Sequence, residues 1–339
     1  MRRGDTKSER RVGLSGPISA FHDMSGGLLV AIGGNATHPR DIKGTAAEQF
    51  AVAAATGRDL LPLMTLDREL IVTHGNGPVV GKILMRQMVA RKRVAPMSLD
   101  ICVAHSQGGI AYLLMQSLEN ALREANNPRH VVCLLTQVEV DPDDPAFGDP
   151  LKPIGHFYDE DEARELADEM NWQMREDSGR GWRHVVASPE PRHIVDISLV
   201  HALAKRGAVV IAGGGGGIPV IRDSGGVRRG VEAVIDKDLT SAHMANVLGI
   251  REMMILTDVP RVALNFGTSQ QRELTRASLS EIRAYRAKGH FPPGSMGPKI
   301  EAAIRFLDRG GERVVIGPLG EALPTLNGDA GTEIRRDGD

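Results

Sequence analysis

The chain has 339 residues, of which 41% are hydrophobic, and its 41 basic and 43 acidic residues leave a formal net charge of -2. That length and composition allow one large α/β domain or two lobes around a sizeable core. The balanced charge argues against nucleic acid or an anionic membrane as a partner. An anionic substrate would therefore be bound by a few local lysines and by backbone amides.

Six short β-rich apolar runs each end in a glycine or polar loop, which is typical of strands covered on both faces. They are Leu28–Ile32, Leu70–Thr73, Val131–Leu135, Ala208–Ala212, Met253–Leu256 and Val314–Ile316. Between them lie predicted helices at Thr45–Val52, Gly81–Arg91, Ile110–Ala125, Ile194–Lys205, Leu239–Leu248, Leu279–Ala287 and Ile300–Leu307. This alternation predicts a mostly parallel sheet with helices on both faces and ligands at the carboxyl ends of its strands.

Two regions depart from the alternation. Residues 1–25 are polar and rich in arginine, and we expect a flexible extension. Residues 141–191 are rich in Pro, Asp, Glu and Trp, and we expect an inserted lid subdomain there. No apolar run has the length of a signal peptide or a bilayer span, and Cys102 and Cys133 lack metal-ligand spacing. These features predict a cytoplasmic protein with two reduced, buried thiols.

Glycine loops follow several of the predicted strands. Gly33-Gly34-Asn35, Gly75-Asn76-Gly77 and the run Gly213–Gly217 could expose backbone N–H groups to a phosphate, especially where a helix follows. Each loop by itself is equally consistent with a tight turn. Three such loops at strand ends favour anion binding, although no Walker motif or protein-kinase motif set is present.

Three lysines have unusual sequence surroundings. Lys237 lies between Asp236 and Asp238, Lys299 follows Gly294-Ser295-Met296-Gly297-Pro298, and Lys152 lies in the predicted insertion. Phosphoryl transfer requires positive charge around the moving group, which lysine supplies as a flexible point charge. For any one of them, an ordinary solvated lysine is the alternative. His74 and His105 adjoin the loops and could contact a ligand or serve only in turns and core.

Seven ordered motifs, spread over residues 28 to 334, closely resemble those of the carbamate kinases. They are Ala31–Ala36, Val72–Pro78, Lys152–Gly155, Gly179–Arg183, Gly214–Val220, Gly230–Asp238 and Gly294–Lys299. The resemblance implies the amino-acid-kinase fold, a three-layer αβα open sandwich with a mainly parallel central sheet and an inserted protruding subdomain. It also implies reversible, Mg²⁺-dependent phosphoryl transfer between ATP and carbamate, giving ADP and carbamoyl phosphate. In such enzymes the reaction commonly proceeds in the direction of ATP formation, and the protein is usually a homodimer.

The same resemblance implies roles for individual residues. The catalytic set would be Lys152, Lys237, Asp238 and Lys299; the substrate loops would be Gly33, Gly34, Asn35, Gly75, Asn76 and Gly77; and the nucleotide contacts would be Gly213, Gly214, Gly215, Lys237, Asp258, Met296 and Lys299. Residues 26–205 would form a substrate-side lobe and residues 206–334 a nucleotide-side lobe, together the kinase domain 26–334. Mg²⁺ would be held mainly by phosphate oxygens and water, so no protein ligand is named.

Related kinases for amino acids resemble K-x-G-G at the first strand, where the lysine serves the transferring phosphate. Ala31 stands at that position here, so the compensating cation would come from Lys152 in the insertion. Two departures from the carbamate kinase pattern, Val79 in place of glutamine and His105 before Ser106-Gln107-Gly108, leave other functions open. These are a sister kinase for another small carboxylate or phosphate acceptor, and a non-catalytic sensor of carbamoyl phosphate or nucleotide.

Overall fold

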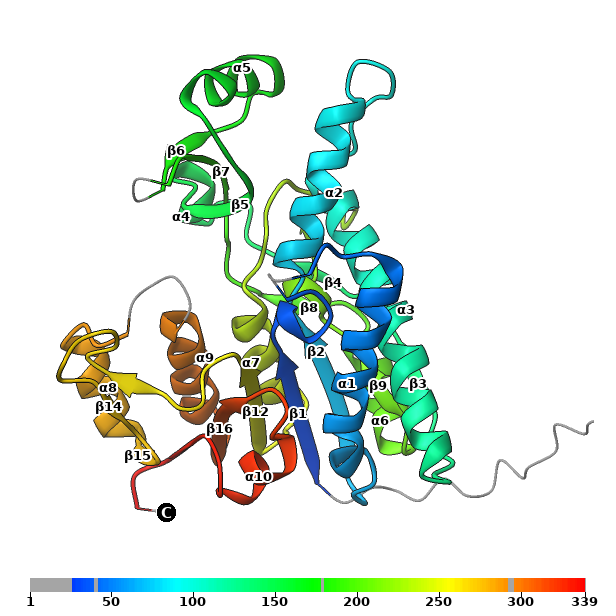
Figure 1. Cartoon of the computed structure of the whole chain (residues 1–339), viewed down its shortest axis with the longest axis vertical. Coiled ribbons are helices and arrows are strands. Elements are labelled where there is room, and N and C mark those ends of the chain that lie inside the picture. The colour runs from blue at the N-terminus through cyan, green and yellow to red at the C-terminus, as the bar shows by residue number, and fades with distance from the viewer. Residues whose placement is uncertain (1–25, 40–41, 178–179, 292–295, 339) are drawn as a thin grey trace, which may run out of the picture.

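The computed structural model describes residues 26–39, 42–177, 180–291 and 296–338 (Figure 1). The extension expected at residues 1–25, Gly179 and the Gly294-Ser295 part of the last motif lie outside these ranges. Within the described residues, no helix is both long enough and apolar enough to cross a bilayer.

The central sheet has eight strands in the order β15-β17-β16-β12-β1-β2-β9-β3. Their bounds are β1 Gly27–Ile32, β2 Glu69–His74, β3 Val131–Cys133, β9 Val209–Ile211, β12 Glu252–Thr257, β15 Arg276–Ser278, β16 Arg313–Pro318 and β17 Thr332–Arg335. Strands β16 through β3 all run parallel, and β17 runs antiparallel to β16. The prediction of a mostly parallel sheet is therefore confirmed.

Alternating side chains of each strand enter different cores, which makes the molecule three layers thick. On β1, Leu28 and Val30 join one core, whereas Leu29 and Ala31 join the other. The first core is covered by α1 Ala46–Met64, α3 Leu99–Glu124 and α10 Ala322–Asn327; the second by α6 Ile197–Lys205, α7 Lys237–Val247, α8 Leu279–Ala287 and α9 Met296–Asp308. This is the αβα sandwich that the motifs implied.

Among the predicted helices, α1 and α3 extend furthest beyond the bounds that the apolar pattern indicated. Helix α1 begins at a capping box between Thr45 and Glu48 and continues twelve residues past Val52, to Met64. Its middle packs so closely on α3 that a Cβ on Gly57 would lie 2.9 Å from the Ser117 carbonyl oxygen. Small residues at this crossing let the two helices approach, and they weaken the hydrophobic periodicity on which the prediction relied. Helix α3 likewise begins eleven residues before Ile110, at Leu99.

The helix predicted from Ile194 starts three residues later, at Ile197. Residues His193–Ile194 instead form β8, which pairs antiparallel with β4 Gln137–Glu139 in a second sheet of order β11-β10-β4-β8. The other strands of this sheet are β10 Ile218–Arg222 and β11 Arg228–Gly230. Pairing with a distant strand has overridden local helical preference at Ile194.

The region with no clear alternation contains its own three-stranded antiparallel sheet, which stands away from the central sheet at the top of Figure 1. It comprises β5 Lys152–Tyr158, β6 Met174–Glu176 and β7 Trp182–Val186, with α4 Pro145–Gly148 before it and α5 Glu160–Met170 inside it. We call Lys152–Val186 the protruding segment. The remaining elements are α2 Gly77–Ala90, the hairpin β13 Ala263–Leu264 with β14 Arg272–Glu273, and the short 3₁₀ turns η2 Gly34–Ala36 and η3 Gly214–Gly216.

Candidate active site

The first two glycine loops meet at the carboxyl ends of the adjacent strands β1 and β2. A Cβ on Gly75 would lie 2.9 Å from the backbone nitrogen of Gly34, so the two loops touch through their backbones. Asn35 Nδ2 donates to Asp258 Oδ2 at the end of β12, and Asn76 Nδ2 donates to Ser106 Oγ over 2.8 Å. The structure thus gathers the predicted substrate-loop residues at one edge of the sheet.

The run Gly213–Gly217 is buried against the second of these loops. A Cβ on Gly214 would lie 2.3 Å from His74 Nε2, and one on Gly215 would lie 2.2 Å from Asn76 Nδ2. Gln107 ties the run to its neighbours, because its Nε2 donates to Thr136 O over 3.1 Å and to Gly214 O over 2.8 Å. These contacts require glycine for packing, whatever further role the run has.

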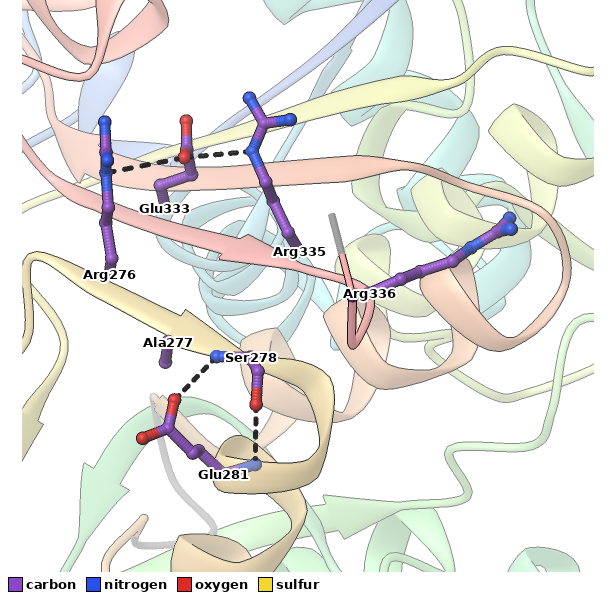
Figure 2. Close-up of a pocket in the computed structure, with 8 residues that line it drawn as sticks. Arg276, Ala277, Ser278, Glu281, Glu333, Arg335 and Arg336 are labelled. Atoms are coloured by element: carbon purple, nitrogen blue, oxygen red, sulfur yellow. Dashed lines mark hydrogen bonds and ion pairs between the residues drawn. The ribbon is translucent and has the colours of Figure 1, made fainter.

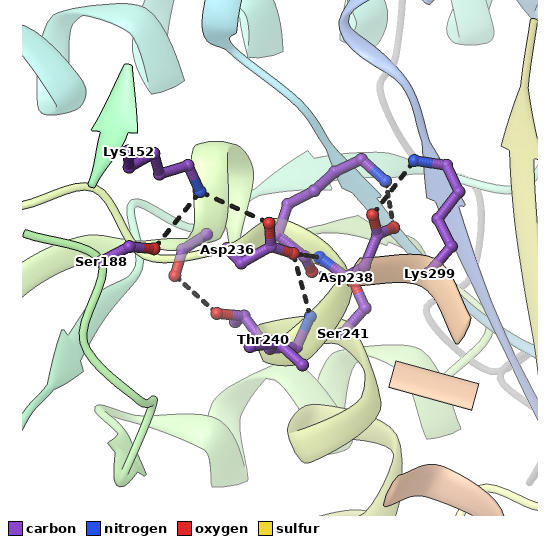
Figure 3. Close-up of polar contacts among 10 residues, drawn as sticks. Lys152, Ser188, Asp236, Asp238, Thr240, Ser241 and Lys299 are labelled. Carbon is purple, nitrogen blue, oxygen red and sulfur yellow. Dashed lines mark hydrogen bonds and ion pairs between the residues drawn. The ribbon is translucent and has the colours of Figure 1, made fainter. Parts of the chain in front are cut away.

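The predicted catalytic lysines of the other lobe converge on one carboxylate (Figure 3). Lys237 Nζ donates to Asp238 Oδ1, and Lys299 Nζ lies 3.3 Å from Asp238 Oδ2. The Asp238 side chain is only 4% exposed, and both lysine side chains are close to 90% buried. Two ammonium groups around one carboxylate leave an excess positive charge, held in a poorly solvated place where it acts strongly on an anion.

Burial and charge shift the acidity of this cluster. Burial lowers the pKa of Lys237 below its ordinary value, the charge of Lys299 lowers it further, and Asp238 opposes both. Burial by itself would raise the pKa of Asp238, but the two lysines outweigh it and the pKa lies below the ordinary value. Asp238 is therefore ionised at neutral pH and serves as the fixed counter-ion that holds the two lysines.

His74 lies beneath the cluster and contributes no charge at neutral pH. Burial lowers its pKa to about 4, helped by the charge of Lys237 and opposed by a contact with a carbonyl oxygen. That contact joins Nδ1 to Gly75 O over 3.1 Å; because a carbonyl can only accept, Nδ1 carries the proton. His105, the other histidine singled out from the sequence, is exposed on α3.

Lys152 reaches the same place from the protruding segment. Its Nζ lies 3.4 Å from Asp236 Oδ2 and 3.5 Å from Ser188 Oγ. Asp236 also caps α7, since its Oδ1 accepts from the backbone nitrogens of Asp238 and Leu239. A helix N-terminus favours anions, so Lys152 and the start of α7 reinforce one another. Ala31, at the position of the missing lysine, is fully buried in the core.

A cavity of about 530 Å³ lies between the Gly75–Gly77 loop and the protruding segment, whereas Gly33, Gly34 and Asn35 do not line it. Its lining includes four cationic side chains and one carboxylate, Lys152, Arg180, Arg183, Lys237 and Asp236. Of the three glycines predicted to contact nucleotide, Gly215 lines it. Asp258, Met296 and Lys299 do not: Asp258 is exposed at the end of β12, while Met296 and Lys299 lie in the first turn of α9. The cavity therefore contains only part of each predicted set: Gly75, Asn76 and Gly77 of the substrate residues, and Gly215 and Lys237 of the nucleotide residues.

Two other features of the described residues bear on where a ligand or a metal ion could bind. No group of three or more His, Cys, Asp or Glu side chains in that part of the chain could hold a metal ion. A second hollow, of about 460 Å³, lies at the β15–β17 edge (Figure 2). There Arg276 and Arg335 both pair with Glu333, which also pairs with Arg313. This is an ion network that ties edge strands together, and none of the predicted site residues lines it.

Several residues of the site had no assigned role in the sequence prediction. In the sequence, Asp236 stands out only as a neighbour of Lys237, Arg180 and Arg183 only as part of a motif, and Ser106 only as part of the stretch after His105. Asp236 had a usable signal, because Asp before a helix start is a common N-cap. The others act through contacts between distant segments, such as Gln107 with Gly214, which leave no local pattern.

Comparison with known proteins agrees with this geometry. A profile of the amino acid kinase family matches residues 28–318. The carbamate kinase of Pyrococcus furiosus is 43% identical over 91% of this chain and 98% of its own length, and the carbamate kinase-like protein YahI of Escherichia coli is also 43% identical with the same coverage. The structure of carbamate kinase from Giardia lamblia bound to AMP-PNP has a TM-score of 0.86 and 39% identity, covering 92% of this chain and 99% of that one.

Proposed function

Because this chain belongs to the amino acid kinase family, we propose that it is a carbamate kinase, which transfers phosphate reversibly between ATP and carbamate to give ADP and carbamoyl phosphate. The observation that carries the proposal is the convergence of Lys152, Lys237 and Lys299 on Asp236 and Asp238, beside two glycine loops. Several curated relatives named carbamate kinase, 41–43% identical over nearly their full length, support the same reaction.

In the proposed mechanism the protein positions the reactants and stabilises charge. In the two glycine loops, the backbone N–H groups of Gly34, Asn35, Asn76 and Gly77 hold the carbamate and the transferring phosphoryl group, because those of Gly33 and Gly75 already donate to Leu256 O and Ile32 O. Lys237 and Lys299 neutralise the nucleotide phosphates, and Asp238 keeps both lysines in place. Lys152 supplies the cation that Ala31 cannot, from the acceptor side. Asp258, after the end of β12, and Met296, at the start of α9, would contact the nucleotide together with Gly213–Gly215.

We propose that Mg²⁺ accompanies the nucleotide and is held mainly by phosphate oxygens and water. The carboxylates nearest the cavity fit this arrangement, because Asp238 is occupied by two lysines and Asp236 by Lys152 and the α7 backbone. When bound, the ion would neutralise phosphate charge; the protein's contribution is the fixed set of lysines around it.

The proposed physiological direction is ATP formation, in the cytoplasm and in a homodimer. A surface that a second copy could bury is offered by α3, where Tyr112 is 58% exposed and Ile101 is 45% exposed. The molecular mass in solution, measured by light scattering, would contradict the dimer if it equalled that of one chain.

A coupled assay with carbamoyl phosphate as sole phosphate donor tests the reaction. ADP, Mg²⁺ and carbamoyl phosphate should yield ATP, and a panel of acyl phosphates should be used poorly. Val79 and His105 do not line the cavity, but neither do Gly33–Asn35 or Lys299, so the sister-kinase alternative is decided by this assay. Preferred use of another acyl phosphate would favour it, and thermal stabilisation by ligands without turnover would favour a sensor.

A further inference from the structure

Two arginines of the protruding segment share a ring and a carboxylate beside the cavity. The guanidinium carbons of Arg180 and Arg183 each lie 5.1 Å from the centre of the Phe157 ring. Arg180 Nη2 lies 2.8 Å from Asp177 Oδ1, and Arg183 Nη1 lies 3.5 Å from Asp177 Oδ2. Two positive charges held around one negative charge leave an excess of positive charge, and both arginines and the ring line the cavity.

The two arginines differ in how firmly they are held. The Arg183 side chain is 20% exposed, and its Nη2 also donates to the Gly155 carbonyl oxygen over 3.3 Å, on the strand that carries Lys152. The Arg180 side chain is 61% exposed, and it contacts Asp177 and the Phe157 ring. Arg183 is therefore built into the strand pairing, whereas Arg180 can exchange one anionic partner for another.

The position of the protruding segment indicates which ligand these arginines face. Strand β5 lies against α2, since a Cβ on Gly81 would be 3.2 Å from Gly155 Cα. Helix α2 begins at Gly77, so the segment is joined to the glycine-loop side of the cavity, where the α2 N-terminus also favours an anion. Of the residues predicted to contact nucleotide, Lys237 and Gly215 line this cavity, and Lys299, Met296 and Asp258 do not line it.

We propose that Arg180 binds the acid oxygens of the acceptor-side substrate, carbamoyl phosphate in the direction of ATP formation, and that Arg183 positions Arg180 and the Lys152 strand. This rests on the proposed function. The planar guanidinium of Arg180 donates two parallel hydrogen bonds to oxygens of the phosphoryl group, which takes over the place of Asp177. Arg180 is thus a specificity-determining residue, because the fork matches a phosphoryl or carboxylate group and offers nothing to an uncharged ligand.

The test is Arg180→Ala in the full-length protein, with ATP formation and ligand binding both measured. Arg180 is the safer site to change, because truncating Arg183 would also remove a contact to the β5 backbone. We expect the KM for carbamoyl phosphate to rise about thirtyfold and the KM for ADP to stay within about twofold, as loss of a charge-assisted bidentate contact implies. Arg180→Lys should raise it only about fivefold, because it keeps the charge without the fork.

A second variant reports on the ring, and a third serves as the matched control. Phe157→Leu should raise the same KM about threefold, through the weaker cation–π contact. Arg164→Ala should leave both KM values unchanged, because Arg164 lies on α5 of the same segment, is 72% exposed and pairs with Glu160 of its own helix. If Arg164→Ala raised the KM for carbamoyl phosphate as much as Arg180→Ala, the effect would come from the loss of positive charge on the segment in general, and the assignment of Arg180 would fail.

Binding is followed independently of turnover by tryptophan fluorescence. Both tryptophans of the chain, Trp172 and Trp182, lie in the protruding segment. Wild type should respond to carbamoyl phosphate, and Arg180→Ala should need about thirtyfold more. If wild type binds it without making ATP and Arg180→Ala binds it about thirtyfold more weakly, the proposed function fails and the arginine assignment stands; equal binding by the two would overturn the arginine assignment as well. If wild type makes ATP and Arg180→Ala keeps its KM for carbamoyl phosphate, or raises that for ADP as much, the arginine assignment fails. Absence of any response or turnover with carbamoyl phosphate would overturn both.

Discussion

The two sides of the cavity supply positive charge in different ways. On the α7–α9 side, Lys237 and Lys299 are nearly buried and share a carboxylate that is itself 4% exposed. On the protruding segment, Lys152 is 27% exposed and Arg180 is 61% exposed, and each rests on a carboxylate it can leave. Charge held in the core acts at full strength on whatever is bound, whereas charge on the segment is screened until a substrate excludes water.

This contrast suggests a division of labour. In the proposed mechanism, the buried cluster provides a preorganised environment for the transferring phosphoryl group, at the cost of burying three ionised groups. The protruding segment is proposed to recognise the acceptor. Changes in the buried cluster should therefore lower the rate of transfer most, and changes in the segment should weaken use of carbamoyl phosphate.

The largest expected effect is that of Lys299→Ala. Its removal should lower kcat about a thousandfold, because one preorganised charge is lost from the transition state. The remaining Lys237–Asp238 pair is neutral as a whole, so the fold should persist, as circular dichroism would verify. Lys288→Ala, at an exposed position after α8, is the matched control. Turnover close to wild type in Lys299→Ala would remove this lysine from the proposed site.

Acid should lower the unfolding free energy of the protein through protonation of His74. Its pKa falls from 6.5 to about 4 on folding, so between these values the unfolded chain binds more protons and stability declines as pH decreases. His74→Gln should flatten the pH dependence of the unfolding free energy over that range by about 3 kcal/mol.

In the protruding segment, burial likewise lowers the pKa of His184 to about 4, so this residue can be compared with His74 in the core. The His184 ring stacks on Trp172 with centres 4.1 Å apart, so His184→Gln should alter the acid response of tryptophan fluorescence and leave global unfolding nearly unchanged. The same loss of pH dependence from both variants would mean that segment and core unfold as one unit.

Lys152→Ala should have a smaller effect than Lys299→Ala. We expect kcat/KM for carbamoyl phosphate to fall about thirtyfold, which corresponds to one charge-assisted contact at a partly solvated site. Arg175→Ala, on β6 of the same segment and paired with Asp149, should change it little. A thousandfold fall in kcat itself would place Lys152 with the buried cluster and abolish the distinction drawn above.

The smallest expected effect concerns two glycines with similar backbone angles. Gly216 has φ +90°, and a Cβ there would lie 2.2 Å from Ile235 O; Gly226 has φ +85°, and a Cβ there would meet nothing within 4 Å. Gly216→Ala should lower the unfolding free energy by about 2 kcal/mol, and Gly226→Ala by about 1 kcal/mol. Denaturant titration measures both, and equal losses would mean that the glycine run is not tightly packed.

The sheet could be predicted because its strands are fully buried. Leu28–Ile32 and Met253–Leu256 are continuous apolar runs with few other solutions than a strand covered on both faces. Helix ends were predicted less well. In α1, for example, Gly57 is required by close packing against the Ser117 carbonyl of another helix, and such a contact cannot be read from the local sequence. The three-stranded sheet of the protruding segment was missed, because β6 has only three residues and the seven residues of β5 show no clear alternation of buried and exposed side chains.

The candidate site shows the same division. The glycine loops, Lys152, Lys237 and Lys299 were recognised from ordered motifs, because backbone exposure and positive charge are properties of single residues and short runs. The sequence by itself determined which cations and loops the protein has. Only the tertiary structure decided that Lys299 shares Asp238 across 61 positions, that Lys152 meets Asp236 across 84, and that Arg180 and Arg183 line the cavity. Such meetings depend on how parallel strands and their crossovers stack, and no local pattern encodes that.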